Sequence, residues 1–228
     1  MGSIDDSILF STTLSEGLRF GVDSFARGEI AFSSRLNEDG FVNSLLHLEA
    51  KYYKRYGSVF FKSLYLGNHT FASSFFLDYG DRLDQDRELL IGGDNAIRGY
   101  EARTFTGDKR VAVNFEDRVH LAENVLRIVN IGAAFFFEVG GSTDENIGEL
   151  FADSLYSDIG VGLRISFPRS SGARVLRFDL ALPLRAGLDD TEVFEPRFLI
   201  SAGQLFGADL RSEIIGNESA GVDIGFDR

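Results

Sequence analysis

The chain has 228 residues, a net charge of −12 and no cysteine. This length suffices for one large domain or two small ones. Without cysteine the chain has no disulfide framework, thiolate metal site or thiol nucleophile. The acidic balance disfavours nucleic-acid binding, because phosphate contacts need clustered Lys and Arg. The opening residues MGSIDDSILF lack the basic region and apolar core of a secretory signal, so a signal was removed or replaced, or the chain is part of a longer product.

The composition favours an all-β fold. The sequence contains 22 Phe and 25 Gly but only 3 Pro and no Trp. Phe favours strands, and Gly serves turns, bulges and close backbone contacts. The mean hydropathy is −0.03, and no apolar run reaches the roughly 18 residues of a membrane-spanning helix. A membrane barrel stays open as an interpretation, because its alternating strands average out near neutral.

Period-two alternation of apolar and polar residues predicts strands along the whole chain. The segment 78–88, DYGDRLDQDRE, is predicted to be a solvated loop, since it lacks the order of an EF-hand calcium site. His47, His69 and His120 lie too far apart in sequence for a typical ligand set, so we expect neither a metal nor a cofactor. The predicted strands are 7–13, 17–22, 28–36, 41–55, 58–71, 109–120, 127–140, 157–168, 173–184 and 196–206.

The later strands divide into two faces of opposite character. One face is almost purely apolar, and a soluble sandwich would produce the same alternation as a membrane barrel. The connections between these strands alternate short and long, which is typical of outer-membrane barrels. We therefore predict an antiparallel transmembrane β-barrel, or the C-terminal portion of one, over 1–206, with a polar tail at 207–228. The second face carries Glu116, Arg118, Glu138, Arg164, Arg177 and Asp179.

Five elements, one of them a pair of consecutive strand segments, occur in an order that resembles a known family. IGGDNAIRGYE (91–101) is followed by RVAVNFEDR, by FFEVG, by GVGLRISFP with RFDLALPL, and by FLISAGQLF. This series resembles the glycine-pair and IRGY loop, the strand motifs and the terminal β-signal of the bacterial surface-antigen family. That family includes the barrel assembly factor BamA, the translocation factor TamA and the two-partner-secretion transporters. The resemblance covers roughly residues 40 to 206.

The resemblance implies a loop folded into the barrel lumen, with an arginine that contacts charged residues on the wall. An unpaired guanidinium inside a barrel would be costly, and Glu116, Glu138 and Asp179 would supply its acceptors. Glu138 stands where the family usually has Asp. The loop motif is Gly92, Gly93, Ile97, Arg98, Gly99 and Tyr100; the wall residues are Glu116, Arg118, Glu138, Gly140, Gly160, Gly162, Arg164 and Asp179; the terminal signal is Ile200, Gly203 and Phe206.

Several details of this site are expectations. The three loop glycines are expected to permit tight backbone turns, and Gly160 and Gly162 to leave room for the loop tip. Arg98 is either a structural latch or a direct participant in gating or substrate handling. The carboxylates of the wall could resemble a glycosidase pair, but their alternation with arginines favours a salt-bridged wall. Four tyrosines are expected to lie near strand ends as an interfacial girdle: Tyr52, Tyr53, Tyr56 and Tyr65.

Three features depart from the family. The chain has room for about nine or ten strands, whereas barrels of the family have sixteen. It has no room for the family's periplasmic POTRA repeats. It also continues beyond Phe206, although the β-signal usually ends the chain. Since an open sheet cannot sit in lipid, the chain closes as a small barrel, pairs with a second copy or another chain, or is part of a larger polypeptide.

The resemblance implies insertion or translocation of proteins at the outer membrane of a Gram-negative-type bacterium, or of a related organelle, without covalent chemistry. The expected partners are outer-membrane lipid, a client protein and a chain that completes the barrel. We expect no enzyme activity in these residues and no nucleic-acid partner. The alternatives are a passive pore or anchor with the same fold, a membrane tether for an enzyme domain outside this sequence, and a soluble β-sandwich.

Overall fold

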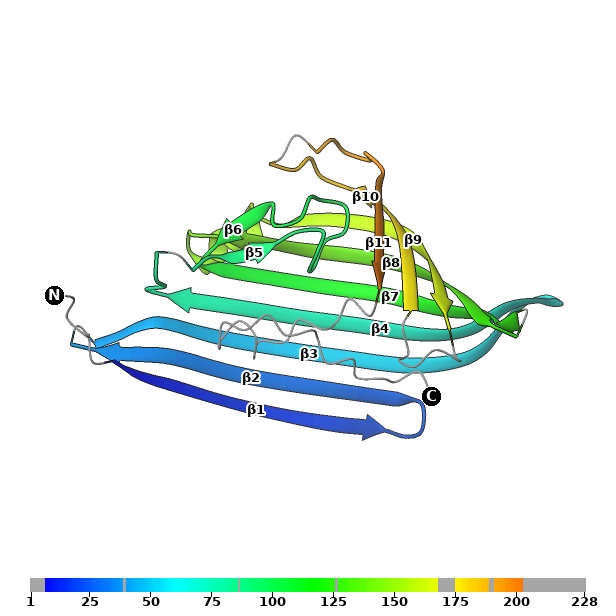
Figure 1. Ribbon diagram of the computed structural model, residues 1–228, viewed down its shortest axis with the longest axis horizontal. Coiled ribbons are helices and arrows are strands. Elements are labelled where there is room, and N and C mark those ends of the chain that lie inside the picture. Colours follow the sequence, from blue (N-terminus) through cyan, green and yellow to red (C-terminus); the bar gives the residue numbers. More distant parts are fainter. Residues whose placement is uncertain are drawn as a thin grey trace.

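The computed structural model describes residues 7–38, 40–85, 87–125, 127–167, 175–188 and 191–202. Nine strands form one antiparallel sheet in the order β1-β2-β3-β4-β7-β8-β9-β10-β11 (Figure 1). Two short strands form a second sheet, and a short helix links β8 to β9. The prediction of an all-β, antiparallel fold is therefore confirmed. Among the described residues no helix is both long and apolar enough to cross a membrane.

Most strands exceed the mean strand of about five to six residues. Their bounds are β1 Ile8–Phe20, β2 Ser24–Asn37, β3 Gly40–Phe61, β4 Leu64–Asp81, β5 Leu89–Ile91, β6 Phe105–Gly107, β7 Lys109–Val125, β8 Val129–Thr143, β9 Tyr156–Ser166, β10 Val175–Pro183 and β11 Arg197–Ala202. The helix α1 spans Ile147–Ala152.

Two predicted breaks between strands are absent, and the predicted strand end at residue 71 is also wrong, because β4 runs to Asp81. The first two predicted strands, 7–13 and 17–22, are one strand, because residues 14–16 stay in the ladder opposite residues 28–30 of β2. The predicted break after residue 55 is also absent, and β3 continues to Phe61. Gly57 is accommodated there as a register shift within the β3–β4 pair. The turn comes instead at Lys62, whose φ is 56°.

The connections alternate between the two ends of the sheet. At one end of the sheet, which we call the short-connection end, β1 is followed by β2, β3 by β4, β7 by β8 and β9 by β10. The opposite, long-connection end carries 82–108, which includes β5 and β6, 144–155, which includes α1, and 184–196. One connection at that end is brief, the turn between β2 and β3. The pattern of short and long connections predicted for the later strands is thus present.

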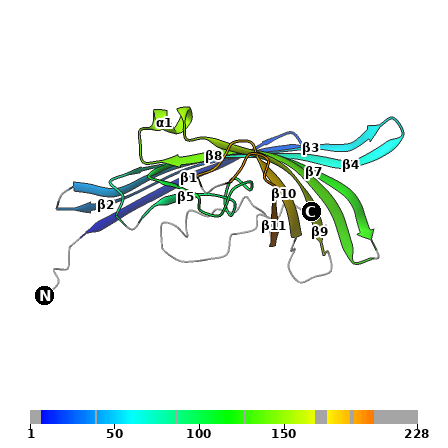
Figure 2. The same cartoon turned by 90° about the horizontal axis from the view of Figure 1, so that it is seen from above.

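The two faces of the sheet have opposite chemical character. We call the face under β5, β6 and their loop the inner face; Figure 2 shows α1 on the other side of the sheet, the outer face. Outer-face side chains in the middle of the sheet are apolar and 38% to 54% exposed: Phe115, Phe135, Phe137, Val161 and Phe178. Their neighbours on the inner face are polar and nearly inaccessible: Asn114, Glu116, Glu138, Asp158, Arg177 and Asp179.

The described sheet has two free edges, since β1 and β11 each pair with one neighbour only. Its apolar core lies between the inner face and the β5–β6 loop, where Ile91, Ile97, Tyr100, Phe105 and Tyr156 are buried together. A smaller cluster gathers Ala31, Leu45 and Leu89. The most buried part of the molecule is therefore the place where the loop meets the sheet, and it contains the IRGY segment.

Candidate functional site: a buried arginine latch

The candidate site is built by the connection from β5 to β6, residues 92–104. This loop lies on the inner face below β7 and β8 in Figure 2. Its apolar residues Ile97 and Tyr100 are fully buried and pack against Ala112 of β7 and Tyr156 of β9. Two buried apolar side chains thus lie on either side of Arg98 in the loop and hold it against the polar inner face.

Arg98 is 1% exposed and is bound by carboxylates from three strands. Its Nε donates to Glu138 at 2.8 Å, its Nη2 to Glu116 at 2.9 Å and its Nη1 to Asp179 at 3.0 Å. Its backbone N–H donates to the second oxygen of Glu138 at 2.7 Å. The three carboxylates that the sequence placed on one face therefore meet at this guanidinium, which we call the arginine latch together with them.

The electrostatics of the latch favour the charged arginine. Burial lowers the pKa of Arg98, but the attraction of Glu138, Glu116 and Asp179 outweighs burial and raises the pKa above its usual range. The guanidinium also lies over an aromatic ring, with its carbon 3.5 Å from the centroid of Phe136. Such cation–π contacts gain strength when they are desolvated. Arg98 therefore stays charged in a site that excludes water.

Three further arginines share the same carboxylates. Arg118 donates from Nε to Glu116 at 2.8 Å, and Arg164 donates to Asp179. Arg177 lies 3.4 Å from Asp179 and 3.7 Å from Glu116. Glu138 is different, because its other side-chain partners are the neutral Asn114 and a second carboxyl group, Asp158, and neither is a cation. Glu138 therefore depends on Arg98 more than Glu116 and Asp179 do.

Asp158 is a residue of the site that the sequence reasoning missed. Its Oδ2 accepts the backbone N–H of Gly99 at 2.9 Å, and it pairs in register with Glu138 across β8 and β9. Two successive loop N–H groups are thus held by carboxylates from two adjacent strands. The sequence does contain a signal for Asp158. It lies two positions before Gly160, so the strand period places it on the same face as Gly160 and Gly162.

The loop glycines allow the backbone to pack closely, and none of them adopts a positive φ. A Cβ on Gly92 would lie 2.3 Å from the backbone of Arg103, and one on Gly93 would lie 2.3 Å from the carbonyl oxygen of Tyr100. A Cβ on Gly99 would lie 2.7 Å from the side chain of Asp158. The pair at 92–93 therefore lets the two arms of the loop touch, and Gly99 lets the loop touch the wall.

The expected role of the wall glycines needs correction. The space beside Gly160 is filled by the Phe136 ring, 2.2 Å from where a Cβ would stand, and the space beside Gly162 by Asp179 and Arg164. The loop tip does not lie directly on these glycines, because the Phe136 ring and the ion pairs occupy that space first. Gly140 does meet the loop, since Ile97 lies 3.3 Å from the position of its Cβ.

Replacing Gly160 with alanine is expected to lower the free energy of unfolding by about 1 to 3 kcal/mol, as overpacking usually does. The new methyl group would displace the Phe136 ring that supports the latch. Gly28→Ala is the matched control on β2, because its nearest neighbour would be 4.0 Å away. Denaturant titration of both variants checks this prediction, and equal stability of the two would contradict it.

Tyr100 ties the loop to the long-connection end. Its hydroxyl lies 2.8 Å from the carbonyl oxygen of Arg185 and 3.1 Å from that of Ser157. Its ring packs edge-on against Phe105 and Tyr156, with centroids 5.3 Å and 5.6 Å apart. Burial raises the pKa of Tyr100 to about 12, since a buried phenolate would lose hydration and repel these carbonyls.

The raised pKa predicts that the docked loop loses stability in alkali. A group whose pKa is raised in the folded state contributes stability below its ordinary pKa, and that contribution is lost as the pH rises through the raised value. For Tyr100 the loss falls between about pH 10 and about 12. The absorbance of wild type minus Tyr100→Phe at 295 nm isolates this titration. A midpoint near pH 10 would show an exposed phenol instead.

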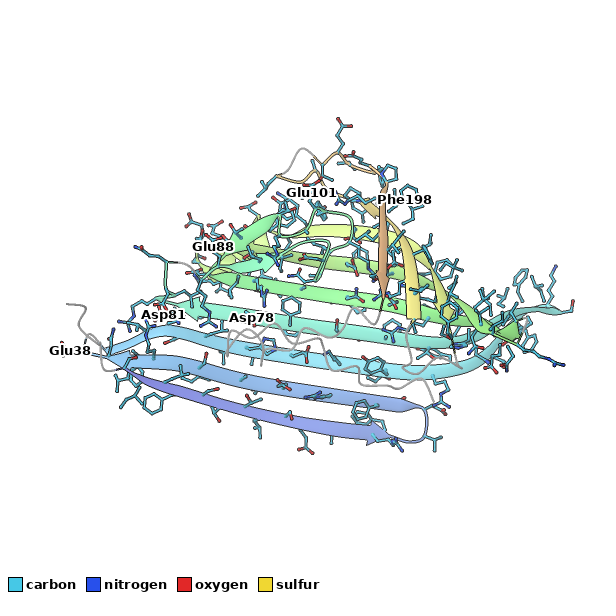
Figure 3. All side chains as sticks on the ribbon, viewed as in Figure 1. Glu38, Asp78, Asp81, Glu88, Glu101 and Phe198 are labelled. Carbon is cyan, nitrogen blue, oxygen red and sulfur yellow. The ribbon has the colours of Figure 1, made fainter. Side chains whose placement is uncertain are left out.

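A second buried charge cluster lies between β3, β4 and β7. Asp78, near the long-connection end of β4 (Figure 3), is fully buried and bound by Nδ1 of His47 and Nε of Arg110. Arg110 also donates to the carbonyl oxygen of Leu90 in β5 at 2.8 Å. The prediction that 78–88 is a solvated loop is therefore wrong at Asp78. No group of metal-binding side chains occurs among the described residues.

Of the predicted terminal signal, Ile200 alone is among the described residues. Ile200 is on the outer face of β11 and is 75% exposed, while Gly203 and Phe206 lie outside the described residues, as does the tail 207–228. In the predicted tyrosine girdle, Tyr53 is misplaced, because it lies on the inner face beneath the guanidinium of Arg118. Neither a scan against protein-family models nor a search of curated proteins found a match for this chain.

Proposed function

We propose that this sheet is the wall of an outer-membrane β-barrel and that the protein inserts or translocates other proteins at that membrane without covalent chemistry. The observation that carries the membrane part of the proposal is the inverted distribution of side chains. Exposed apolar residues cover the outer face, while charged residues are buried on the inner face. In water this arrangement would be unfavourable, but in lipid it matches an apolar wall around a polar lumen.

The arginine latch supports the resemblance to the surface-antigen family. Each loop residue from Ile97 to Tyr100 contacts the wall: Ile97 and Tyr100 by packing, Arg98 and Gly99 by hydrogen bonds. The dense contacts favour the latch role of Arg98 over a direct role with a client. In our proposal the loop braces β7, β8, β9 and β10 from inside the lumen, so that any movement of the barrel occurs elsewhere.

The free edges of β1 and β11 require partners in a bilayer. Unpaired backbone N–H and C=O groups find no water within the hydrocarbon region. We propose that further strands, from a second copy, from another chain or from a longer polypeptide, complete the barrel. The edge of β11 would then be one lip of the join between first and last strands.

The experiment that tests the proposal starts with the chain extracted from outer membranes. Its native mass and its gel mobility before and after heating are compared. A heat-modifiable species supports a folded barrel, and its mass separates a self-closed monomer from an assembly. Recovery in the soluble fraction without any shift on heating would overturn the membrane assignment.

The activity is tested by a second measurement in vesicles. Folding rates of a small outer-membrane client are compared with and without the reconstituted chain. Faster client insertion supports the assembly function. Ion conductance without any effect on the client would instead assign the passive pore that the sequence leaves open.

A further inference from the structure

One hairpin extends beyond the rest of the sheet. The last residues of β3 and the first of β4, residues 55–67, form what we call the tip hairpin. β3 pairs with β2 only as far as Lys54, and β4 pairs with β7 only from Asn68 onward. Figure 1 shows this hairpin projecting past the neighbouring turns at the short-connection end. It is therefore a two-stranded arm with no strand on either side among the described residues.

The arm bends toward the outer face. In Figure 2 it curves to the same side as α1, whereas the short-connection ends of β7 and β9 curve the other way. The bend coincides with the register shift between Arg55 and Gly57, where a bulge strengthens local twist. Gly67, with φ 114°, allows the return strand to pass Val119, which lies 2.5 Å from the position of its Cβ. The backbone itself thus aims the arm outward.

The arm begins where the apolar outer face ends. Charged side chains occupy that face near the short-connection end, where His69 Nδ1 and Asp117 lie 2.8 Å apart. On β3, Lys54 lies at the same level of the sheet as Asp117. Beyond it, large apolar side chains become exposed again, from 37% to 64%: Phe60, Phe61, Leu64, Tyr65 and Leu66. An exposed apolar cluster of this kind signals an interaction surface.

The arm is also basic in an acidic protein. The net charge of the chain is −12, yet no Asp or Glu occurs between Glu49 and Asp78. The same stretch contains Lys51, Lys54, Arg55 and Lys62. Lys51 is paired with Glu49 on the inner face. The ammonium groups of Lys54 and Lys62 lie over the rings of Tyr56 and Phe61, at 5.0 Å and 5.8 Å from the centroids.

We propose that the tip hairpin binds the anionic phospholipid surface of the leaflet at the short-connection end. The inference rests on the proposed function, which places the sheet across a membrane. Aromatic rings and lysines together are the side chains that favour the lipid headgroup region. The outward bend brings them over the lipids that surround the barrel, and the lack of acidic residues fits a negative surface. The arm thereby fixes the depth and tilt of the sheet.

The test uses tryptophan, which the natural chain lacks. Phe61→Trp is placed in the arm, Phe194→Trp in the long-connection loop and Phe135→Trp on the outer face. The full chain is reconstituted in vesicles of phosphatidylcholine and phosphatidylglycerol, with bromine on one lipid or the other. We expect Phe61→Trp to be quenched more by brominated phosphatidylglycerol than by brominated phosphatidylcholine, and Phe194→Trp by neither.

A second experiment removes a positive charge from the hairpin. Lys62→Gln is expected to reduce the preference for the anionic lipid by about fivefold, the effect of about 1 kcal/mol per cation near such a surface. Arg82→Gln is the control, because Arg82 is an exposed cation in the connection that follows β4. Equal quenching by the two lipids, or none, would overturn the proposal, as would an unchanged preference in Lys62→Gln.

The reference position separates two kinds of failure. If Phe135→Trp is quenched by lipid while Phe61→Trp is not, the sheet lies in the membrane and the arm does not bind lipid. If neither is quenched, the proposed function itself fails. A blue-shifted emission of Phe61→Trp without lipid quenching would point to a protein partner and would also overturn the lipid assignment.

Discussion

Arg98→Ala is expected to cost about 3 to 5 kcal/mol of unfolding free energy, the usual effect of removing one partner from a buried ion pair. The loss falls mainly on Glu138, since Glu116 retains Arg118 and Asp179 retains Arg164. Arg98→Lys should recover only part of the stability, because an ammonium group does not reproduce a planar fork that reaches three carboxylates. Denaturant titration of the reconstituted protein measures each variant.

Loop release is measured separately in the same variants. The chain has no cysteine, so Ala96→Cys, at a position that is 5% exposed, gives a single thiol in the docked loop. We expect the thiol of Ala96→Cys to be labelled slowly when Arg98 is present and quickly when Arg98→Ala is added. The double variant Arg98→Ala with Glu138→Gln should regain part of the stability, because it removes the buried charge left behind. Unchanged stability, labelling and gel mobility in Arg98→Ala would refute the latch.

Val161→Arg is expected to destabilise the membrane-bound protein by about 2 to 4 kcal/mol, the cost of an arginine facing lipid near the bilayer centre. Val161 lies on the outer face between Phe135 and Leu180. The matched control is Val193→Arg in a long connection. The two valines are 46% and 45% exposed, so in water the two substitutions should have similar small effects.

The comparison of these two variants isolates the solvent that the outer face meets. The folding of both variants is measured in the same vesicles by gel mobility and denaturant titration. A large loss for Val161→Arg and a small loss for Val193→Arg supports a lipid-facing sheet. Similar small losses would mean that the outer face meets water or another soluble surface, and the membrane assignment would fall.

The strands and their faces could be predicted because alternation is a local property. A two-residue period assigns Glu138 and Phe137 to opposite faces without any knowledge of neighbouring strands. The same reasoning brought the three carboxylates of the latch to one face. It failed at the predicted break over residues 56–57, because Gly57 looks like a turn residue in the sequence but β3 accommodates it as a register shift.

The partners of buried charges could not be predicted in the same way. Asp78 stands at the start of an acidic, loop-like segment, and its partners His47 and Arg110 are 31 and 32 residues away. Nothing local distinguishes such a carboxylate from a solvated one. Alternation places Phe136 on the same face as Glu138, but its position between Gly160 and Arg98 depends on the register of β8 with β9 and on the docked loop. The sequence therefore predicts the faces better than the contacts across them.

The positions of the latch residues along the chain impose an order on folding. Arg98 is 18, 40 and 81 residues from its three acceptors. Closing a longer loop costs more chain entropy, and distant contacts form slowly. Since Asp179 belongs to β10, the guanidinium gains its full set of partners only after β7, β8, β9 and β10 have come together. The docked loop is therefore a late event, and its protection from labelling reports that this half of the sheet has been assembled in the correct register.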